Sequence, residues 1–185
     1  GSATVDHCTF AYNVGGKTGC CFYGALDAHG APSTTTITNN VFYANDLPLT
    51  IPATISLDDS NVFTNPADAL VGNKMNGVFL ETDGEFTAAI TWAETEVAFV
   101  VNDNDLWVDV AASLTLADDV VVKFLPDGTL LYDGTNLLNH DGTGVAFTSF
   151  KDDTQKGDTN GDGAITTPAD NDWGGIYNNS DAVSD

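Results

Sequence analysis

CTFAYN (residues 8–13), NVFYAN (residues 40–45) and NVFTN (residues 61–65) repeat one pattern in the first third of the chain. In each stretch a Cys or Asn stands two positions before a Phe, and an Asn follows the Phe within three positions. Strands that recur at intervals of roughly 20 to 30 residues are typical of a coil in which each turn stacks on the next. The pattern therefore predicts parallel strands here.

The repeated side chains have distinct expected places in such a coil. Asn40 and Asn61 would form an amide ladder at one turn, where each side chain satisfies backbone groups of a neighbouring turn. Cys8 occupies the same ladder position, which favours a structural thiol. The expected interior stack consists of Phe10, Phe42 and Phe63. The expected second corner position holds Asn13, Asn45 and Asn65.

The rest of the chain has short β-branched and aromatic runs and almost no helical periodicity. Asp-Gly turns could join some of these runs as antiparallel hairpins, but their close, regular spacing favours the sides of a solenoid. The sequence thus predicts an all-β chain. The runs are VAFVV (97–101), LWVDV (106–110), SLTLAD (113–118), VVVKFL (120–125), TLLYDG (129–134) and GVAFTSF (144–150).

A longer phrase follows these runs: FTS (147–149), DDT (152–154), GDTNGDG (157–163) and DWGGI (172–176). Residues 97–176, which contain it, resemble the right-handed parallel β-helix regions, pectate-lyase-like solenoids, of large secreted bacterial surface proteins. Residues 3–65 are similar to the turns that follow DWGGI in that family, whereas residues 73–96 match least. The resemblance implies a right-handed parallel β-helix with a calcium-binding loop insertion, in a protein outside the cell or on its surface.

The order of these parts differs from the family order, because the turns that follow DWGGI there come first here. We therefore expect both ends of the β-helix to be uncapped, in a unit of a polymeric or tandem array or in a piece of a longer protein. The predicted segments are 1–75 and 97–185, both β-helical, joined by 76–96. The expected head-to-tail interface comprises Val5, Cys8, Phe10, Trp173, Ile176 and Tyr177.

The loop DTNGDG resembles the start of an EF-hand, with Asp158, Asn160 and Asp162 as alternate oxygen ligands before the Ala164 carbonyl. Position 12 is Ala169 instead of a bidentate Glu, and the flanking segments are strands, so the loop is not an EF-hand. A dockerin would need a second copy, which the chain lacks. The alternating oxygens still suit Ca²⁺, in a structural role. The predicted ligands are Asp152, Asp153, Asp158, Asn160, Asp162, Ala164, Asp170 and Asp172.

The chain is strongly acidic: its 185 residues include 27 Asp or Glu but only five Lys or Arg, for a net charge of -22. This balance disfavours nucleic acids and anionic membranes as partners, and favours cations. No apolar run reaches transmembrane length. Cys20 and Cys21 are adjacent and can hardly pair with each other, so Cys8 forms at most one disulfide, with either of them.

Catalysis has weak support in the sequence. The β-helical lyases commonly use an Arg or Lys base, but Arg is absent here and the Lys residues do not cluster. The best carboxylate group is Asp58 and Asp59, with Asp46 and His29 on neighbouring turns, and adjacent Asp residues at a corner are usually turn formers. We therefore expect no enzyme.

The sequence analysis favours a secreted structural or adhesive module, such as an adhesin or filament repeat. It would bind Ca²⁺ and associate head to tail with copies of itself or with adjacent repeats. The alternative is a carbohydrate-binding or polysaccharide-cleaving β-helix. For that alternative, Trp92, Trp107 and Trp173 are candidate platform residues, although Trp173 more simply packs the acidic loop and the face on which Trp107 lies is undecided.

Overall fold

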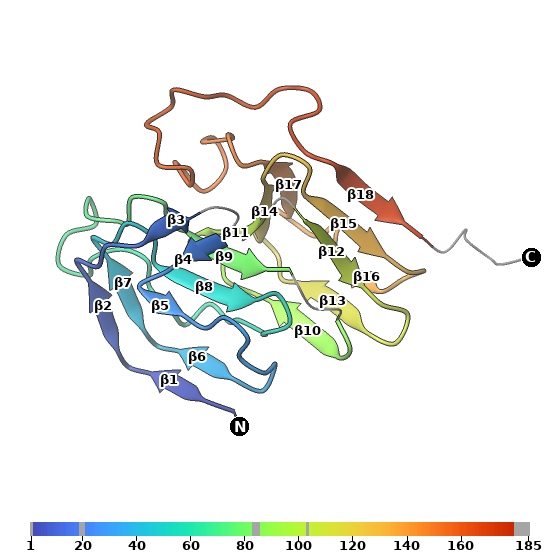
Figure 1. The fold of residues 1–185 in the computed structure, drawn as a ribbon, viewed down its shortest axis with the longest axis horizontal. Helices are drawn as coiled ribbons and strands as arrows, with labels where there is room; N and C mark the ends of the chain where they lie inside the picture. Colours follow the sequence, from blue (N-terminus) through green and yellow to red (C-terminus); the bar gives the residue numbers. More distant parts are fainter. Residues whose placement is uncertain (1, 19–20, 83–85, 103, 180–185) are drawn as a thin grey trace, which may run out of the picture.

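A computed structural model describes residues 2–18, 21–82, 86–102 and 104–179 (Figure 1). In these residues the chain is all-β and contains no helix. Most strand pairs are parallel, as the sequence predicts, so the Asp-Gly turns do not close antiparallel hairpins. Since the described part has no helix, it has none that is long and apolar enough to cross a membrane.

The largest sheet is parallel and has six strands, in the order β17-β14-β11-β9-β8-β5. It includes strands from all three predicted segments, so one continuous set of backbone hydrogen bonds connects them. Its strands are β5 (Leu26–Asp27), β8 (Leu49–Pro52), β9 (Gly77–Glu81), β11 (Ala98–Val101), β14 (Val121–Phe124) and β17 (Ala146–Ser149).

Two smaller parallel sheets stand beside it, and the chain visits the three sheets in a repeating order. After β11 it enters one small sheet at β12, the other at β13, and returns to the six-stranded sheet at β14. The next cycle, through β15, β16 and β17, adds one strand to each sheet. The small sheets consist of β12 (Asp105–Val108), β15 (Thr129–Tyr132) and β18 (Gly175–Asn178), and of β10 (Ala89–Trp92), β13 (Ser113–Leu116) and β16 (Leu137–Leu138).

The N-terminal repeats also pair in parallel. β1 (Thr4–Asp6) pairs with β6 (Thr36–Thr38), and β2 (Thr9–Ala11) pairs with β7 (Val41–Tyr43). The glycine-rich stretch between β2 and β5 contains an antiparallel hairpin that the sequence analysis did not predict. It is formed by β3 (Gly16–Thr18) and β4 (Cys21–Tyr23).

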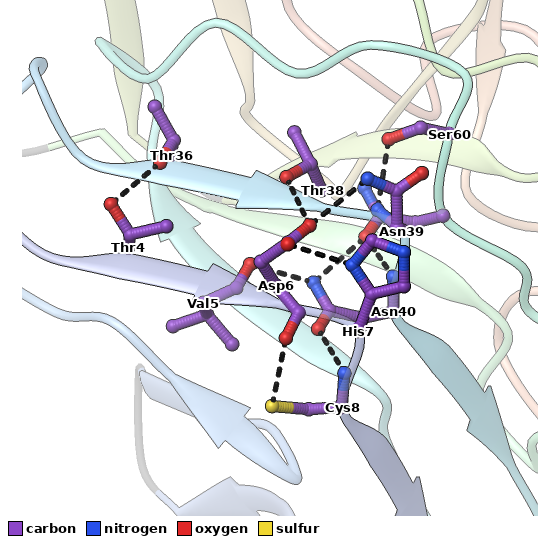
Figure 2. A network of polar contacts seen from close by, with 11 residues as sticks. Thr4, Val5, Asp6, His7, Cys8, Thr36, Thr38, Asn39, Asn40 and Ser60 are labelled. Atoms are coloured by element: carbon purple, nitrogen blue, oxygen red, sulfur yellow. Dashed lines mark hydrogen bonds and ion pairs between the residues drawn. The ribbon is translucent and has the colours of Figure 1, made fainter.

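The predicted aromatic stack lies in the core. The ring centroids of Phe10 and Phe42 are 5.0 Å apart with nearly parallel planes, and those of Phe42 and Phe63 are 5.2 Å apart. The first amide ladder is also confirmed, because Asn40 Nδ2 donates to Asn61 Oδ1 at 3.1 Å. Cys8 N donates to Asn40 Oδ1 at 2.9 Å (Figure 2).

The second ladder differs from the prediction at its third position. Asn45 connects Asn13 to Asn73, because its Oδ1 accepts from Asn13 and its Nδ2 donates to Asn73 Oδ1 at 2.8 Å. The predicted member, Asn65, instead accepts a local hydrogen bond from Ala67 N. The chain leaves the repeat at residue 65 and returns to it at residue 73, so sequence spacing after the Phe does not identify the ladder residue.

The central strands β9, β11 and β14 of the six-stranded sheet are buried on both faces, which explains why they read as nearly continuous apolar runs. Alternate residues such as Val78 and Phe99 belong to the main core between the sheets. The intervening residues point away from that core and form a second apolar cluster. It consists of Phe22, Leu47, Phe79, Val100 and Leu125, with Met75 and Phe150 packed against it.

Candidate functional site

The acidic segment, residues 151–172, connects β17 to β18 and covers part of the outer face of the six-stranded sheet. It contains the predicted calcium loop, and Figure 1 shows it as the orange stretch above β14 and β17. Phe150, directly before it, packs against Phe79 of the second cluster with ring centroids 6.1 Å apart. The segment is therefore held against the sheet instead of extending into solvent.

A buried lysine fixes the segment to the sheet. Lys123 lies on β14 with its side chain on the outer face, and it is completely buried. Its Nζ donates to the Gly157 carbonyl at 2.9 Å and to Thr159 Oγ1 at 2.8 Å. Burial lowers the pKa of Lys123 to about 8, and the negative charges of the nearby Asp residues oppose this shift.

Two further contacts fix the position of the segment. Gly77 on β9 leaves room for it, since a Cβ at this glycine would lie 3.0 Å from Thr159 Cγ2. Lys156 Nζ donates to the Thr95 carbonyl at 2.6 Å, which ties the segment to the connection between β10 and β11.

Three of the predicted ligands converge. Carboxylate oxygens of Asp153, Asp158 and Asp162 lie within 4.8 Å of one another, and all three residues are half-buried. We call them the aspartate cluster. Oxygen donors at this spacing suit a hard cation such as Ca²⁺, which takes six to eight oxygen ligands and would complete its shell with backbone carbonyls and water.

The DTNGDG loop is organised by its own carboxylates. Asp158 accepts hydrogen bonds from the backbone N–H groups of Gly161, Asp162 and Gly163. Asp162 in turn accepts from the N–H groups of Ile165 and Thr166. Gly161 and Gly163 have positive φ angles of 72° and 68°, a conformation that glycine adopts without steric cost.

The electrostatics of the cluster suit a bound cation. Burial and the negative charges of Asp158 and Asp162 raise the pKa of Asp153 above its ordinary value. Asp153 Oδ1 is a buried oxygen that accepts no hydrogen bond from the described residues. A hydrogen bond from Thr166 lowers the pKa of Asp162. The donor set and this orphaned oxygen therefore fit Ca²⁺.

The other predicted ligands lie apart from the aspartate cluster or play a different part. Asp152 accepts hydrogen bonds from Thr154 and Thr148; these bonds outweigh its burial and lower its pKa. Asp172 forms an ion pair with Lys151 at 2.7 Å, which lowers the pKa of Asp172.

Asn160, Ala164 and Asp170 have less direct relationships to the cluster. Asn160 belongs to the loop, where its Oδ1 accepts from Asp162 N and its Nδ2 donates to Thr166 Oγ1. Ala164 is exposed and has a φ of 71°. Asp170 is exposed beyond the loop and does not belong to the cluster.

The predicted interface residues lie at two ends of the molecule. Val5, Cys8 and Phe10 are on or beside β1 and β2, whereas Ile176 and Tyr177 are on β18, next to the C-terminal end in Figure 1. Cys8 is exposed, is not in a disulfide, and its thiol donates to the Asp6 carbonyl. Of its possible disulfide partners, Cys20 lies outside the described residues.

The other predicted interface residue, Trp173, is partly buried and packs against the core. Its ring stacks on that of Phe124 with centroids 4.4 Å apart, so it packs the end of the acidic segment onto the core. This agrees with its predicted structural role.

The candidate catalytic carboxylates have local roles. Asp58 accepts from Ser60, and Asp59 accepts from the N–H and hydroxyl of Thr95. His29 Nδ1 is hydrogen-bonded to Asp27, two residues away. Asp58 also lines a groove of about 210 Å³ between β6 and β10, whose other polar side chains are hydroxyls. Asp46 does not line this groove.

A titratable residue that the sequence analysis did not identify lies near Asp59. Glu94 is completely buried at the end of β10, and its Oε1 accepts from Glu96 N at 2.8 Å. Its Oε2 is buried without a hydrogen-bond partner in the described part of the chain. Burial, with the negative charges of Asp59 and Glu96, raises the pKa of Glu94 to about 8.

Comparison with known proteins does not identify a family. No family model matches the chain, and neither the curated proteins nor the solved structures contain a match. Function must therefore be inferred from the described residues themselves.

Proposed function

We propose that the chain is an extracellular structural or adhesive module that binds Ca²⁺ at the aspartate cluster. The observation that carries the proposal is the convergence of Asp153, Asp158 and Asp162 on a segment that covers the sheet. The metal would hold this segment in place by neutralising carboxylates that otherwise repel each other. Its role is structural, because the ligands come from one excursion between two strands.

The proposed architecture is a right-handed parallel β-helix. The repeating visit to three sheets supports it, since each cycle of the chain adds one parallel strand to each sheet. The ladders and the Phe stack support it as well, because equivalent residues of successive repeats lie in register. Such stacking gives stiffness and length from short repeats.

Self-association would join the two ends of the array. Ala3 O and His7 N bond to β6, so by alternation the N–H groups of Thr4 and Asp6 point to the free edge of β1. At the other end, β16, β17 and β18 are the last strands of their sheets. We propose that these edges pair by main-chain hydrogen bonds, between copies or with adjacent repeats of a larger protein.

Calcium titration with thermal unfolding tests the metal site. Ligand that binds only the folded state stabilises it by about 2.7 kcal/mol at 100 times its Kd. The Tm of the wild type and of the control Asp170→Asn should rise with Ca²⁺, and the rise should be lost in Asp158→Asn. A wild-type Tm that does not respond to Ca²⁺ would refute the proposed site.

Electron microscopy in millimolar Ca²⁺ tests the association. The wild type at high concentration should form fibres or short stacks, and Thr4→Pro should not, because proline removes one N–H from the free edge of β1. Thr4→Val, which keeps that N–H, is the matched control. Single particles at every concentration would exclude self-assembly of this chain, and fibres unaffected by Thr4→Pro would exclude the β1 edge.

A further inference from the structure

An apolar row crosses the outer face of the β12-β15-β18 sheet. Trp107, Leu131 and Tyr177 are paired in parallel register on the three strands, so their side chains lie side by side. Their neighbours Leu106 and Leu130 are completely buried, whereas Trp107 is 40% and Tyr177 55% exposed. The row therefore points away from the core, which settles the face on which Trp107 lies.

The Tyr177 ring is held against the strand. Its hydroxyl donates to the Gly174 carbonyl at 2.8 Å, and its ring passes over Gly175, where a Cβ would lie 3.2 Å from ring atoms. Gly175 has a φ of 116°, which only glycine adopts readily. Little conformational entropy remains to be lost when a ligand covers this ring.

Polar residues border the row on both sides. On one side, Asp105 pairs with Thr129 across β12 and β15. Each lies two positions before the row residue of its strand, and so on the same face of the sheet as the row. On the other side, Asp109, Asp133 and Asn179 directly follow the paired residues of β12, β15 and β18. The carboxylates of Asp105 and Asp133 accept no hydrogen bond from the residues that the structure describes, so they are free to accept from a ligand.

We propose that this row binds an extended, uncharged β-1,4-linked glycan that lies across the three strands. Neighbouring strands are about 4.8 Å apart, so the Cα atoms of Trp107 and Tyr177 stand roughly 10 Å apart with that of Leu131 between them. A flat pyranose chain advances by about one strand spacing per sugar, so alternate sugars meet the faces of Trp107 and Tyr177. The bordering carboxylates and amide accept and donate hydrogen bonds to the sugar hydroxyls.

Charge decides between the possible occupants. Asp105, Asp109 and Asp133 beside the row, and the net charge of -22, repel uronate or sulfated glycans. If a second copy docked through the row, the same three carboxylates of the two copies would face each other and oppose the contact. An uncharged chain of hydroxyl groups meets no such penalty. The inference goes beyond the proposed function and does not depend on the calcium site.

Binding of cellohexaose, compared with a β-1,4-linked mannuronate hexamer, tests the inference. Isothermal titration of the full chain in EDTA should show saturable binding of cellohexaose and none of the anionic hexamer. Trp107→Ala should weaken binding by roughly tenfold or more, as truncation of a central aromatic contact commonly does. Trp107→Phe should retain most of the affinity. Tyr12→Ala is the matched control, because Tyr12 is an exposed aromatic outside the row.

Three results would overturn the proposal: no binding of cellohexaose by the folded wild type, equal binding of the mannuronate hexamer, or affinity unchanged in Trp107→Ala. A wild-type dimer that Trp107→Ala converts to a monomer would assign the row to a second copy instead. Because the titration is done in EDTA, its outcome is separate from that of the calcium experiment.

Discussion

Lys123 on β14 and Thr159 in the acidic segment are hydrogen-bonded at 2.8 Å, and both side chains are completely buried. The sheet thus places one positively charged side chain, that of Lys123, beneath a segment that is rich in carboxylates. The segment satisfies this cation with a hydroxyl and a backbone carbonyl, while Asp152, Asp153 and Asp158 favour its charge from nearby. This contact positions the aspartate cluster.

Replacing Lys123 by Met should destabilise the protein by about 2 kcal/mol, because it leaves the Gly157 carbonyl and the Thr159 hydroxyl buried without their donor. Urea denaturation at neutral pH measures the change. Lys17→Met is the control, since Lys17 is exposed and its ammonium lies over the Phe22 ring at 5.3 Å. Equal losses in the two variants would contradict the anchoring role of Lys123.

The second amide ladder gives a graded prediction. Asn45 is buried, and its side chain satisfies Asn13 N, the Phe10 carbonyl and Asn73 Oδ1. Asn45→Ala should therefore cost about 3 kcal/mol, since several buried groups lose their partners. Asn13→Ala, at the exposed end of the ladder, should cost about 1 kcal/mol or less. Similar free energies of unfolding for the two variants would contradict the larger contribution of the buried Asn45.

The sequence was sufficient to predict the N-terminal repeats and insufficient to predict the acidic segment's contacts. Phe10, Phe42 and Phe63 share a pattern that only stacking satisfies, and the structure confirms it. In β14, the alternation of the strand places Lys123 on the face opposite the core. From the sequence alone, its side chain is therefore expected to be exposed to solvent. Nothing local to β14 indicates that residues more than 30 positions later cover this face.

Glu94 illustrates the same limit. It follows β10 in a stretch that also contains Glu96, and such a charged stretch is typical of a turn exposed to solvent. In the structure, however, Glu94 is completely buried. The burial depends on Asp59 and the connection around Thr95, which the chain brings together from separate repeats. The aspartate cluster, by contrast, is mostly local, so alternating Asp residues around glycines indicated it, although the predicted carboxylates Asp152, Asp170 and Asp172 do not belong to it.

Glu94 should make stability fall as pH rises. Its pKa is about 8 in the folded protein and 4.5 in the absence of structure, so the folded state holds this proton more tightly. Its contribution is fully present below about pH 4.5 and is lost progressively as the pH rises to 8. Above its lowered pKa of about 8, Lys123 would make the free energy of unfolding rise with pH. Urea denaturation is therefore measured between roughly pH 5 and 7.5, where Lys123 does not oppose the effect of Glu94.

The variant Glu94→Gln isolates this effect, because its amide does not titrate. The free energy of unfolding of the wild type, relative to Glu94→Gln, should decrease by up to about 1.4 kcal/mol for each pH unit in this range. Glu81→Gln is the control, since Glu81 is half-buried, accepts a hydrogen bond from Gly30 N and is not one of the charges that raise the pKa of Glu94. Parallel profiles for the wild type and Glu94→Gln would contradict a protonated, buried Glu94.

Asp153→Asn should have opposite effects with and without calcium. Without the metal, the substitution removes a charge that Asp158 and Asp162 repel, so the variant should be more stable than the wild type, by about 1 kcal/mol or less and roughly 2–4 °C in Tm. With saturating Ca²⁺ the order should reverse, because the cluster has lost one of its three carboxylates. Thermal unfolding in EDTA and in Ca²⁺ gives both values. Asp170→Asn removes the same charge outside the cluster and should shift both values equally. If Asp153→Asn also shifted both equally, its carboxylate would not be a metal ligand, and the repulsion within the cluster would be relieved by solvent alone.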